Sequence, residues 1–330
     1  MSVWLPQFAC PECAAAAVTE GAGDLRCGGC GRRFAYQGGM FRFLTADRLA
    51  AAEPLLRQYR AVRAREGYRA LTAECYRMLP CVRSDSPHAS EWRIRAESFQ
   101  QLQRRVLLGA REKHAERAPS ARFPGTLPAG GSGPLRVLDL GAGNGWLSHR
   151  MARLGHHAVA TDRLDDEDDG LGACRHYPTP FARVHADFDA LPFTPAQFDL
   201  VVFNGSLHYA PDVAATLARA HRMLAPGGTL AVMDSPMYHH DADGHAMVAE
   251  KLRRFRTEYG LTHVVHPSVG FLTPASLAHV VAPFGLHGRF FRSRGPLRWR
   301  VGRELARIRM RRAPAAFGVW LARASEEAHR

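Results

Sequence analysis

The sequence predicts an α/β fold, in which a doubly wound parallel sheet is preceded by a small N-terminal module and a helical segment. The first observation is that short apolar strands alternate with amphipathic helices between residues 134 and 330, which is the pattern of a parallel sheet covered on both faces. The second is a glycine-rich turn directly after the first strand, where such sheets bind ligands. The third is a set of four cysteines near the N-terminus at metal-ligand spacing.

Length and composition are those of a folded globular protein with room for about two domains. The chain has 330 residues, of which 46% are hydrophobic and 23% charged. This balance excludes a disordered, collagen-like or coiled-coil chain. The net charge of +13 favours an anionic partner. The basic excess is confined mainly to residues 45–133 and 288–330, whereas residues 134–287 are net acidic.

No targeting segment or membrane-spanning segment is expected. The N-terminus lacks a basic stretch followed by a long apolar run. The longest stretch without charged side chains, residues 259–288, is interrupted by prolines and glycines and will not form a membrane helix. We therefore expect a cytoplasmic location and no membrane partner.

The N-terminal cysteines form two Cys-x-x-Cys pairs, Cys10 with Cys13 and Cys27 with Cys30, separated by thirteen residues. Each pair forms a tight turn that directs two thiolates to one point, and four thiolates suit a tetrahedral zinc ion. Because no coordination position stays open, this zinc would be structural. Disulfides, which a reducing compartment disfavours, and iron in a similar knuckle are the alternatives. With short strands near residues 33–36 and 40–44, residues 1–44 would form a zinc ribbon.

Residues 45–133 are predicted to form a helical cap and a linker. Helices are expected over residues 47–67, 68–79 and 90–108, because apolar residues recur there at helical spacing. Residues 117–134 are rich in Pro, Gly and Ser and form the linker. The cap is either a lid over a substrate pocket or a helical layer with ordinary core aromatics, and the sequence favours neither.

The remaining residues, 134–330, form the main domain. Its expected strands cover residues 135–140, 157–162, 182–187, 198–204, 229–234, 286–292 and 314–323. Its expected helices cover residues 146–155, 213–224, 272–285 and 299–312, of which the last is rich in Arg. In an open sheet of this kind, ligands bind at the carboxyl ends of the strands.

Several motifs stand in order between residues 134 and 236. They are the glycine-rich run 137–145, Asp162 at the end of the second strand, Asp187 after the third, the fourth strand from residue 198, and the Leu-Ala-Pro-Gly-Gly-Thr-Leu run 224–230. In this combination the segment resembles the class I S-adenosylmethionine-dependent methyltransferases, of the methyltransferase type 11-like kind. The resemblance implies a seven-stranded Rossmann-like sheet and S-adenosylmethionine as the cofactor.

The glycine-rich turn is expected to hold the methionine part of the cofactor. Gly141, Gly143 and Gly145 let the backbone approach a ligand closely, because they carry no Cβ atom. In the family that the segment resembles, the acid at the position of Asp139 orients this loop and the cofactor amine. Its alternative role is that of a turn or cap residue.

Three further positions are expected to contact the cofactor's nucleoside. Asp162 is placed to accept hydrogen bonds from both ribose hydroxyls. The resemblance places Asp187 at the adenine amino group, with Phe188 beside the ring. Asn204, at the end of the fourth strand, is the last cofactor-binding candidate. For the two acids, helix capping or turn formation is the alternative.

Methyl transfer depends mainly on holding the acceptor in line with the methyl group, and a general base is needed only for a hydroxyl or a protonated amine. His208, directly after the fourth strand, is the catalytic candidate. Tyr238, His239 and His240 follow the fifth strand and are further candidates, with surface or packing roles as the alternative. The acidic run 165–169 is expected to be a solvated loop rather than a metal site.

The sequence limits the acceptor without identifying it. The run that starts at Asn204, Asn-Gly-Ser-Leu, differs from the Asn-Pro-Pro-Tyr type of enzymes that methylate exocyclic amines, and no cysteine lies there as a covalent nucleophile. We expect a small-molecule acceptor methylated on O, N or C.

Two alternatives remain. One is an RNA base methyltransferase that resembles the bacterial ribosomal-RNA guanine-N1 enzymes, which also carry an N-terminal zinc ribbon, and that binds RNA through the Arg-rich segments 45–133 and 288–330. The other is a catalytically silent partner subunit, in which the ribbon mediates protein contacts.

Overall fold

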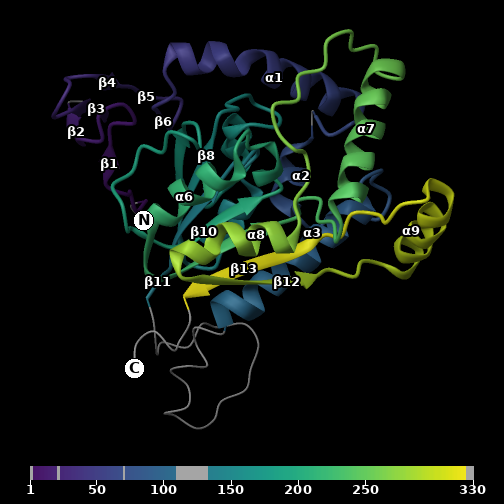
Figure 1. The fold of residues 1–330 in the computed structure, drawn as a ribbon. Coiled ribbons are helices and arrows are strands. Elements are labelled where there is room, and N and C mark those ends of the chain that lie inside the picture. The colour runs from purple at the N-terminus through teal and green to yellow at the C-terminus, as the bar shows by residue number, and fades with distance from the viewer. Residues whose placement is uncertain (1–2, 21–22, 70, 109–132, 325–330) are drawn as a thin grey trace, which may run out of the picture.

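The main domain is built on a nine-stranded sheet (Figure 1). The computed structural model describes residues 3–20, 23–69, 71–108 and 133–324. The strand order is β12-β13-β11-β10-β7-β8-β9-β6-β5. The strands are β5 (Tyr36–Gln37), β6 (Met40–Arg42), β7 (Arg136–Leu140), β8 (His157–Asp162), β9 (Ala182–His185), β10 (Phe198–Asn204), β11 (Leu224–Met233), β12 (Leu286–Arg292) and β13 (Gly318–Ala324). The five neighbouring strands β11, β10, β7, β8 and β9 run parallel to one another. Strand β13 is antiparallel to both of its neighbours, β11 and β12.

Seven of these strands are those that the sequence predicts, and two are an addition from the N-terminal segment. The hairpin of β5 and β6 joins the sheet because β6 pairs in parallel with β9, with Phe41 opposite Val184. The expected boundary at residue 44 is therefore wrong for residues 36–42, which belong to the main sheet. Phe41 is buried there, and the hairpin covers the edge that β9 would otherwise expose.

Helices cover both faces of the sheet, as the alternating pattern predicts. One face packs against α6 (Val213–Met223) and α8 (Pro274–Val281), and the other against α5 (Trp146–Arg153), α2 (Ala73–Met78) and α3 (Ala89–Leu102). Successive residues of the central strands alternate between the two apolar layers: in β7, Val137 faces one layer and Leu138 the other. Burial on both faces explains why these strands are almost entirely apolar.

The N-terminal module is a four-stranded antiparallel sheet of β1 (Phe8–Ala9), β2 (Ala16–Glu20), β3 (Asp24–Cys27) and β4 (Arg33–Phe34). It is fixed to the main domain by aromatic packing. The Phe8 ring lies 4.7 Å from the ring of Phe41, 5.2 Å from that of Phe43 and 5.9 Å from that of Phe193. The backbone N–H of Ala9 also donates to the carbonyl of Pro192 at 2.9 Å.

The helical cap consists of α1 (Ala46–Arg65), α2 and α3, and α3 continues as a π-helical segment, Gln103–Leu108. The first and third expected helices are confirmed nearly to their ends. The second is shorter than expected because it begins only after Thr72, whose side chain accepts from the backbone N–H of Cys75. The expected linker 117–134 lies almost entirely outside the described residues.

The acidic run 165–169 was expected to be solvated, and this expectation is wrong for four of its five residues. Each of the four pairs with an arginine from the N-terminal part of the chain. The pairs are Arg42–Asp165 at 2.5 Å, Arg63–Asp169 at 3.1 Å, Arg69–Asp166 at 3.3 Å and Arg69–Asp168 at 2.9 Å. The run holds the cap on the main domain, and Arg63 and Arg69 of the cap are thereby occupied within the molecule.

Two further helices lie towards the C-terminus. The helix α7 (Asp241–Thr257) was not expected, whereas α9 (Leu297–Met310) forms between β12 and β13 where the Arg-rich helix was predicted. In Figure 1, α9 stands at the edge of the molecule, away from the sheet. Among the described residues, no helix is long and apolar enough to cross a membrane.

Candidate active site

The turn after β7 allows a close approach that only glycine permits. Gly141 has a φ of +70°, and a Cβ atom on it would lie 2.4 Å from Cβ of Ser206. Gly145 has a φ of +72°, and a Cβ atom there would lie 2.5 Å from Sγ of Cys174. Both the backbone conformation and the space therefore require glycine at these positions. Gly143, between them, lines a cavity at the carboxyl ends of the strands, hereafter the first cavity.

Asp162 lies at the end of β8 and faces the first cavity. Its carboxylate accepts from the backbone N–H of Gly143 at 2.7 Å and from that of Leu164 at 2.8 Å. These bonds fix the carboxylate beside the glycine turn, while burial raises its pKa. A carboxylate oxygen accepts more than one hydrogen bond, so Asp162 retains the capacity to bind a diol.

Asn204 and Phe188 complete the part of the first cavity that the sequence predicts. Oδ1 of Asn204 is buried and has no hydrogen-bond partner in the structure. A buried acceptor of this kind costs free energy unless a donor reaches it, so Asn204 suits a ligand with an N–H or O–H group. Phe188 is buried at the cavity wall, and the guanidinium of Arg163 lies 5.3 Å from its ring centre.

The other two acids predicted for the cofactor lie outside the lining of the first cavity. Asp139 is fully buried and accepts from the hydroxyl of Ser148 at 2.9 Å, which ties β7 to α5; burial raises its pKa to about 7. The carboxylate of Asp187 accepts from the backbone N–H of Asp189 at 3.0 Å and lies 3.7 Å from Arg163. The geometry of Asp187 corresponds to the turn-forming role that the sequence left open, whereas Asp139 links a strand to a helix.

A second cavity adjoins the first, and the cap forms much of the wall between them. The two cavities share Leu55, Tyr59 and Arg63 of α1, Arg95 of α3, and Gly205 and Tyr209 after β10. The helix α7 adds Lys251, Leu252, Arg254 and Phe255 to the second cavity. The cap is therefore part of the site. The position of α1 and α3 corresponds to the lid alternative of the sequence analysis, whereas α7 was missed as a wall because only the tertiary fold brings it to the strand ends.

Asp234, directly after β11, lines the second cavity together with Glu66 and Glu91, and the sequence analysis singled out none of these acids. The backbone of Asp234 has a φ of +50°, a strained conformation for a residue other than glycine. Oδ1 accepts from the hydroxyl of Ser98 at 2.6 Å, whereas Oδ2 is buried without a hydrogen-bond partner. Burial raises the pKa of this carboxyl to about 6. An acid at the end of the fifth strand was the signal available for it.

The histidines and the tyrosine that were candidates for the base are placed differently from one another. His208 lines the second cavity, where its Nδ1 lies 3.2 Å from Oγ of Ser235. Burial lowers its pKa to about 3, so the ring is neutral and weakly basic. Tyr238 is buried against Phe271, outside the lining of both cavities. His239 and His240 are exposed next to α7 and likewise lie outside that lining.

Two cations of the second cavity make no ion pair with a described residue, although the charge of one of them, Arg95, opposes the rise in the pKa of Asp234. Arg95 and Lys251 face this cavity, and no carboxylate of a described residue lies within the 4.0 Å of an ion pair from either. Arg95 lies over the ring of Trp92 at 4.8 Å, and Lys251 lies 5.7 Å from the ring of Tyr209. By contrast, Arg63 is neutralised by Asp169. The second cavity therefore has cationic side chains available to an anionic group.

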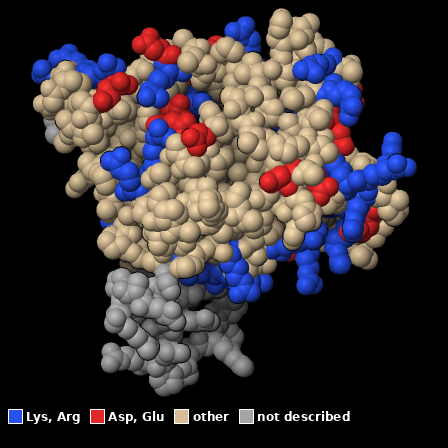
Figure 2. Space-filling view, in the orientation of Figure 1, with Lys and Arg blue, Asp and Glu red and all other residues tan. Residues whose placement is uncertain are grey.

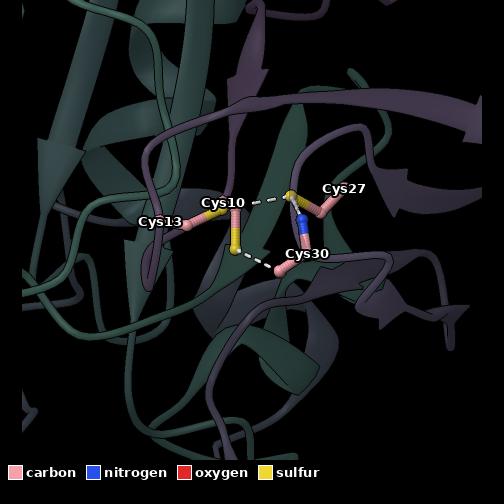
Figure 3. A group of neighbouring side chains, drawn as sticks. All are labelled: Cys10, Cys13, Cys27 and Cys30. Atoms are coloured by element: carbon pink, nitrogen blue, oxygen red, sulfur yellow. Dashed lines mark hydrogen bonds between the residues drawn. The ribbon is translucent and has the colours of Figure 1, made fainter.

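The four N-terminal cysteines converge as their spacing predicts (Figure 3). All four sulfur atoms lie within 4.8 Å of one another, with Cys10 and Cys30 at 3.8 Å and Cys13 and Cys27 at 3.3 Å. Sulfurs on a tetrahedral zinc ion are about 3.8 Å apart. Neither pair is at disulfide distance, which is about 2 Å. Two backbone N–H groups, those of Gly29 and Cys30, point at Sγ of Cys27 at 3.3 Å and would stabilise a thiolate.

Known proteins resemble the central part of the chain. Residues 138–232 match the family described as a methyltransferase domain. An uncharacterized methyltransferase of Mycobacterium tuberculosis is 37% identical over 97 residues, which are 29% of this chain and 49% of that protein. A ubiquinone biosynthesis O-methyltransferase of Xylella fastidiosa is 32% identical over 164 residues, 46% of this chain and 61% of that protein. The chain thus spans about half the length of these curated relatives.

Among solved structures, magnesium protoporphyrin IX methyltransferase from Synechocystis is similar with a TM-score of 0.45 and 14% identity, covering 76% of this chain and 94% of that one. The names of the two relatives in sequence do not mention RNA, so the RNA alternative gains no support from them. The family match coincides with the segment that carries the glycine turn, Asp162 and Asn204. Residues 138–232 are therefore similar in sequence to a methyltransferase domain.

Proposed function

We propose that this chain is an S-adenosylmethionine-dependent methyltransferase that transfers a methyl group to an O, N or C nucleophile of a small molecule. The observation that carries the proposal is the arrangement of the two cavities. The first contains the glycine turn, Asp162 and Asn204, and the second opens beside it behind Gly205 and Tyr209. A cofactor and an acceptor in adjoining cavities can be held in line, which supplies much of the rate of a methyl transfer.

The first cavity suits the cofactor through its own donors and acceptors. When bound, S-adenosylmethionine supplies an electrophilic methyl group on its sulfonium. Asp162 would bind the ribose hydroxyls, Phe188 would lie beside the adenine, and the unpaired Oδ1 of Asn204 would accept from the cofactor's ammonium group. Asp139 would support cofactor binding indirectly, because its hydrogen bond with Ser148 ties β7 to α5 on either side of the glycine turn.

In the second cavity, Asp234 is the better placed base for an acceptor that must lose a proton. Its Oδ2 has no partner, its backbone is strained, and its pKa of about 6 leaves it ionised near neutral pH. His208 is weakly basic, and we assign it a role in contacting the acceptor. Arg95 and Lys251 line this cavity and make no ion pair with a described residue, so we propose that the acceptor carries a carboxylate or phosphate.

Calorimetric titration of the whole chain with S-adenosylmethionine tests the enzymatic function. We expect a dissociation constant in the micromolar range or below, and no binding at high micromolar concentration would contradict the proposal. Acceptors are then sought among small carboxylates and phosphates by following the demethylated cofactor product. A chain that binds the cofactor but methylates only RNA would support the alternative acceptor.

We also propose that Cys10, Cys13, Cys27 and Cys30 bind one structural zinc ion. The convergence of the four sulfurs supports this, and a Cβ on Gly29 would lie 2.8 Å from Cβ of Ala15 and 3.4 Å from Sγ of Cys13. Elemental analysis should find one zinc per chain. Cys27→Ser should lose the zinc and loosen the packing of β1 to β4, with Cys81→Ser, at an exposed cysteine outside the cluster, as the control. Zinc retained in Cys27→Ser, or iron in the parent chain, would contradict the assignment.

A further inference from the structure

The helix α9 presents an apolar stripe to solvent. Leu297 is 71% exposed, Val301 53%, Leu305 63% and Ile308 75%, which makes them the four most exposed large apolar side chains among the described residues. Their spacing of four, four and three residues places them along one side of the helix. Soluble proteins rarely leave a contiguous apolar face uncovered, so this stripe indicates a binding surface.

Arginines border the stripe on both sides. At 100° per residue, Arg298 and Arg309 lie beyond one edge, and Arg300, Arg307 and Arg311 beyond the other. All five are exposed, and Glu304 is the only acid of the helix. Figure 2 shows blue side chains gathered at the edge of the molecule where Figure 1 places α9.

The opposite side of α9 is held against the main domain, which fixes the stripe outward. Arg303 donates to the carbonyl of Ala315, and its guanidinium lies 4.2 Å from the ring of Trp299 and 5.9 Å from that of Phe317. Trp299 and Arg303 also line a small cavity together with Arg95 and Asp234. The helix thus borders the site, with one face turned towards it and the other towards solvent.

We propose that α9 docks the protein on an anionic lipid surface. The helix would lie in the plane of the interface, with the four apolar side chains at the acyl boundary and the flanking arginines on lipid phosphates. Long arginine side chains reach the headgroups from the edges of a buried apolar stripe. This refines the expectation that the chain has no membrane partner: α9, with 14 residues, lies on a membrane and does not cross it.

Two other occupants fit the surface less well. A second copy of α9 would bring the arginine flanks of two helices together, with only Glu304 in each helix to compensate them. RNA would bind the arginines but would leave the four apolar side chains in water, or bury them against a charged backbone. An anionic lipid surface satisfies the stripe and its flanks together.

Sedimentation of the full chain with vesicles tests the proposal. We expect binding to vesicles of phosphatidylcholine mixed with phosphatidylglycerol, weaker binding to phosphatidylcholine alone, and a loss of binding as salt is raised. Leu305→Glu with Ile308→Glu should weaken binding by about tenfold or more, and Arg300→Gln with Arg307→Gln by about tenfold. Leu5→Glu, at an exposed leucine far from α9 in the sequence, is the matched control.

Several outcomes would overturn the proposal. Circular dichroism and cofactor calorimetry first verify that each variant is folded. If the folded parent chain does not bind anionic vesicles, lipid docking is excluded. It is also excluded if Leu5→Glu weakens vesicle binding as much as the substitutions in α9 do. The stripe would instead serve self-association if the parent chain is a dimer that does not bind vesicles and the Leu305→Glu, Ile308→Glu double variant is a monomer. Because vesicle binding needs no cofactor, these results are independent of the proposed enzymatic function.

Discussion

The first and second cavities adjoin in space but are built in different ways. The first takes its glycine turn, Asp162 and Asn204 from one continuous segment, residues 139–206, at the ends of neighbouring parallel strands. The second combines α1, α3, α7 and Asp234, which are separated by up to about two hundred residues. A short motif therefore encodes the proposed cofactor contacts, whereas the proposed acceptor contacts depend on long-range packing.

The ion pairs between the cap and the acidic run 165–169 connect the first cavity with the second. Arg63 and Asp169 both line the first cavity, and Arg63 also lines the second. Arg63 therefore belongs to the walls of both cavities. The comparison predicts that damage to the cap affects both cavities, whereas damage at either strand end affects one.

Breaking the Arg63–Asp169 ion pair should have the largest effect on the free energy of unfolding and on cofactor affinity. The two side chains are largely buried and make bonds of 3.1 and 3.3 Å. Asp169→Asn leaves the arginine without its counter-charge, so we expect the free energy of unfolding to fall by about 3 kcal/mol and cofactor affinity to fall with it. Urea unfolding measures the first and calorimetry the second.

The matched control for that prediction is Asp85→Asn, which breaks the exposed pair of Arg83 and Asp85. Because exposed ion pairs contribute little, this variant should lose less than about 1 kcal/mol of unfolding free energy. Similar small losses in both variants would mean that the acidic run does not hold the cap.

Asp234→Asn should have the next largest effect on the free energy of unfolding, which should rise instead of fall. Since the pKa of Asp234 is raised to about 6 from 3.8, the native state keeps a proton that the unfolded chain releases. The free energy of unfolding therefore falls as pH rises from about 4 to about 6. The variant should lack this loss and gain about 2 to 3 kcal/mol at pH 7 relative to the parent.

Urea titrations of the parent and of Asp234→Asn at several pH values isolate this contribution, because Asp139, whose pKa is also raised, is the same in both. Cofactor affinity should not change, since Asp234 lines the second cavity and not the first. A parent and variant with parallel pH profiles would show that Asp234 is not buried as a partnerless acid.

Asp162→Ala should weaken cofactor binding by about 1.5 to 3 kcal/mol, the range for a hydrogen bond to a charged group. Asp187→Ala should weaken it less, because the carboxylate of Asp187 is engaged with Arg163 outside the cavity lining. Calorimetry with S-adenosylmethionine compares the two. Equal losses would restore Asp187 to the adenine contact that the family resemblance implies.

The sequence predicted the parts of the fold that local patterns encode. The seven-strand alternation, the glycine turn and the convergence of four cysteines each depend on spacing within a short run. The addition of β5 and β6 to the sheet and the pairing of the acidic run depend on which surfaces meet after folding. Residues 165–169 are visible in the sequence as five acids, but the sequence does not show that Arg42, Arg63 and Arg69 pair with four of them.

The smallest change in cofactor binding is expected for Lys251→Met, which preserves the length of the stem and removes the charge. Lys251 lines the second cavity and not the first, so the binding free energy of S-adenosylmethionine should shift by less than about 0.5 kcal/mol. The Michaelis constant of an anionic acceptor should instead rise about tenfold, because the lost contact is a charge-assisted one. A neutral acceptor should show no such rise. If cofactor affinity fell as far in Lys251→Met as in Asp162→Ala, the two cavities would act as one site. The distinction between a cavity built from a short motif and a cavity built by long-range packing would then be wrong.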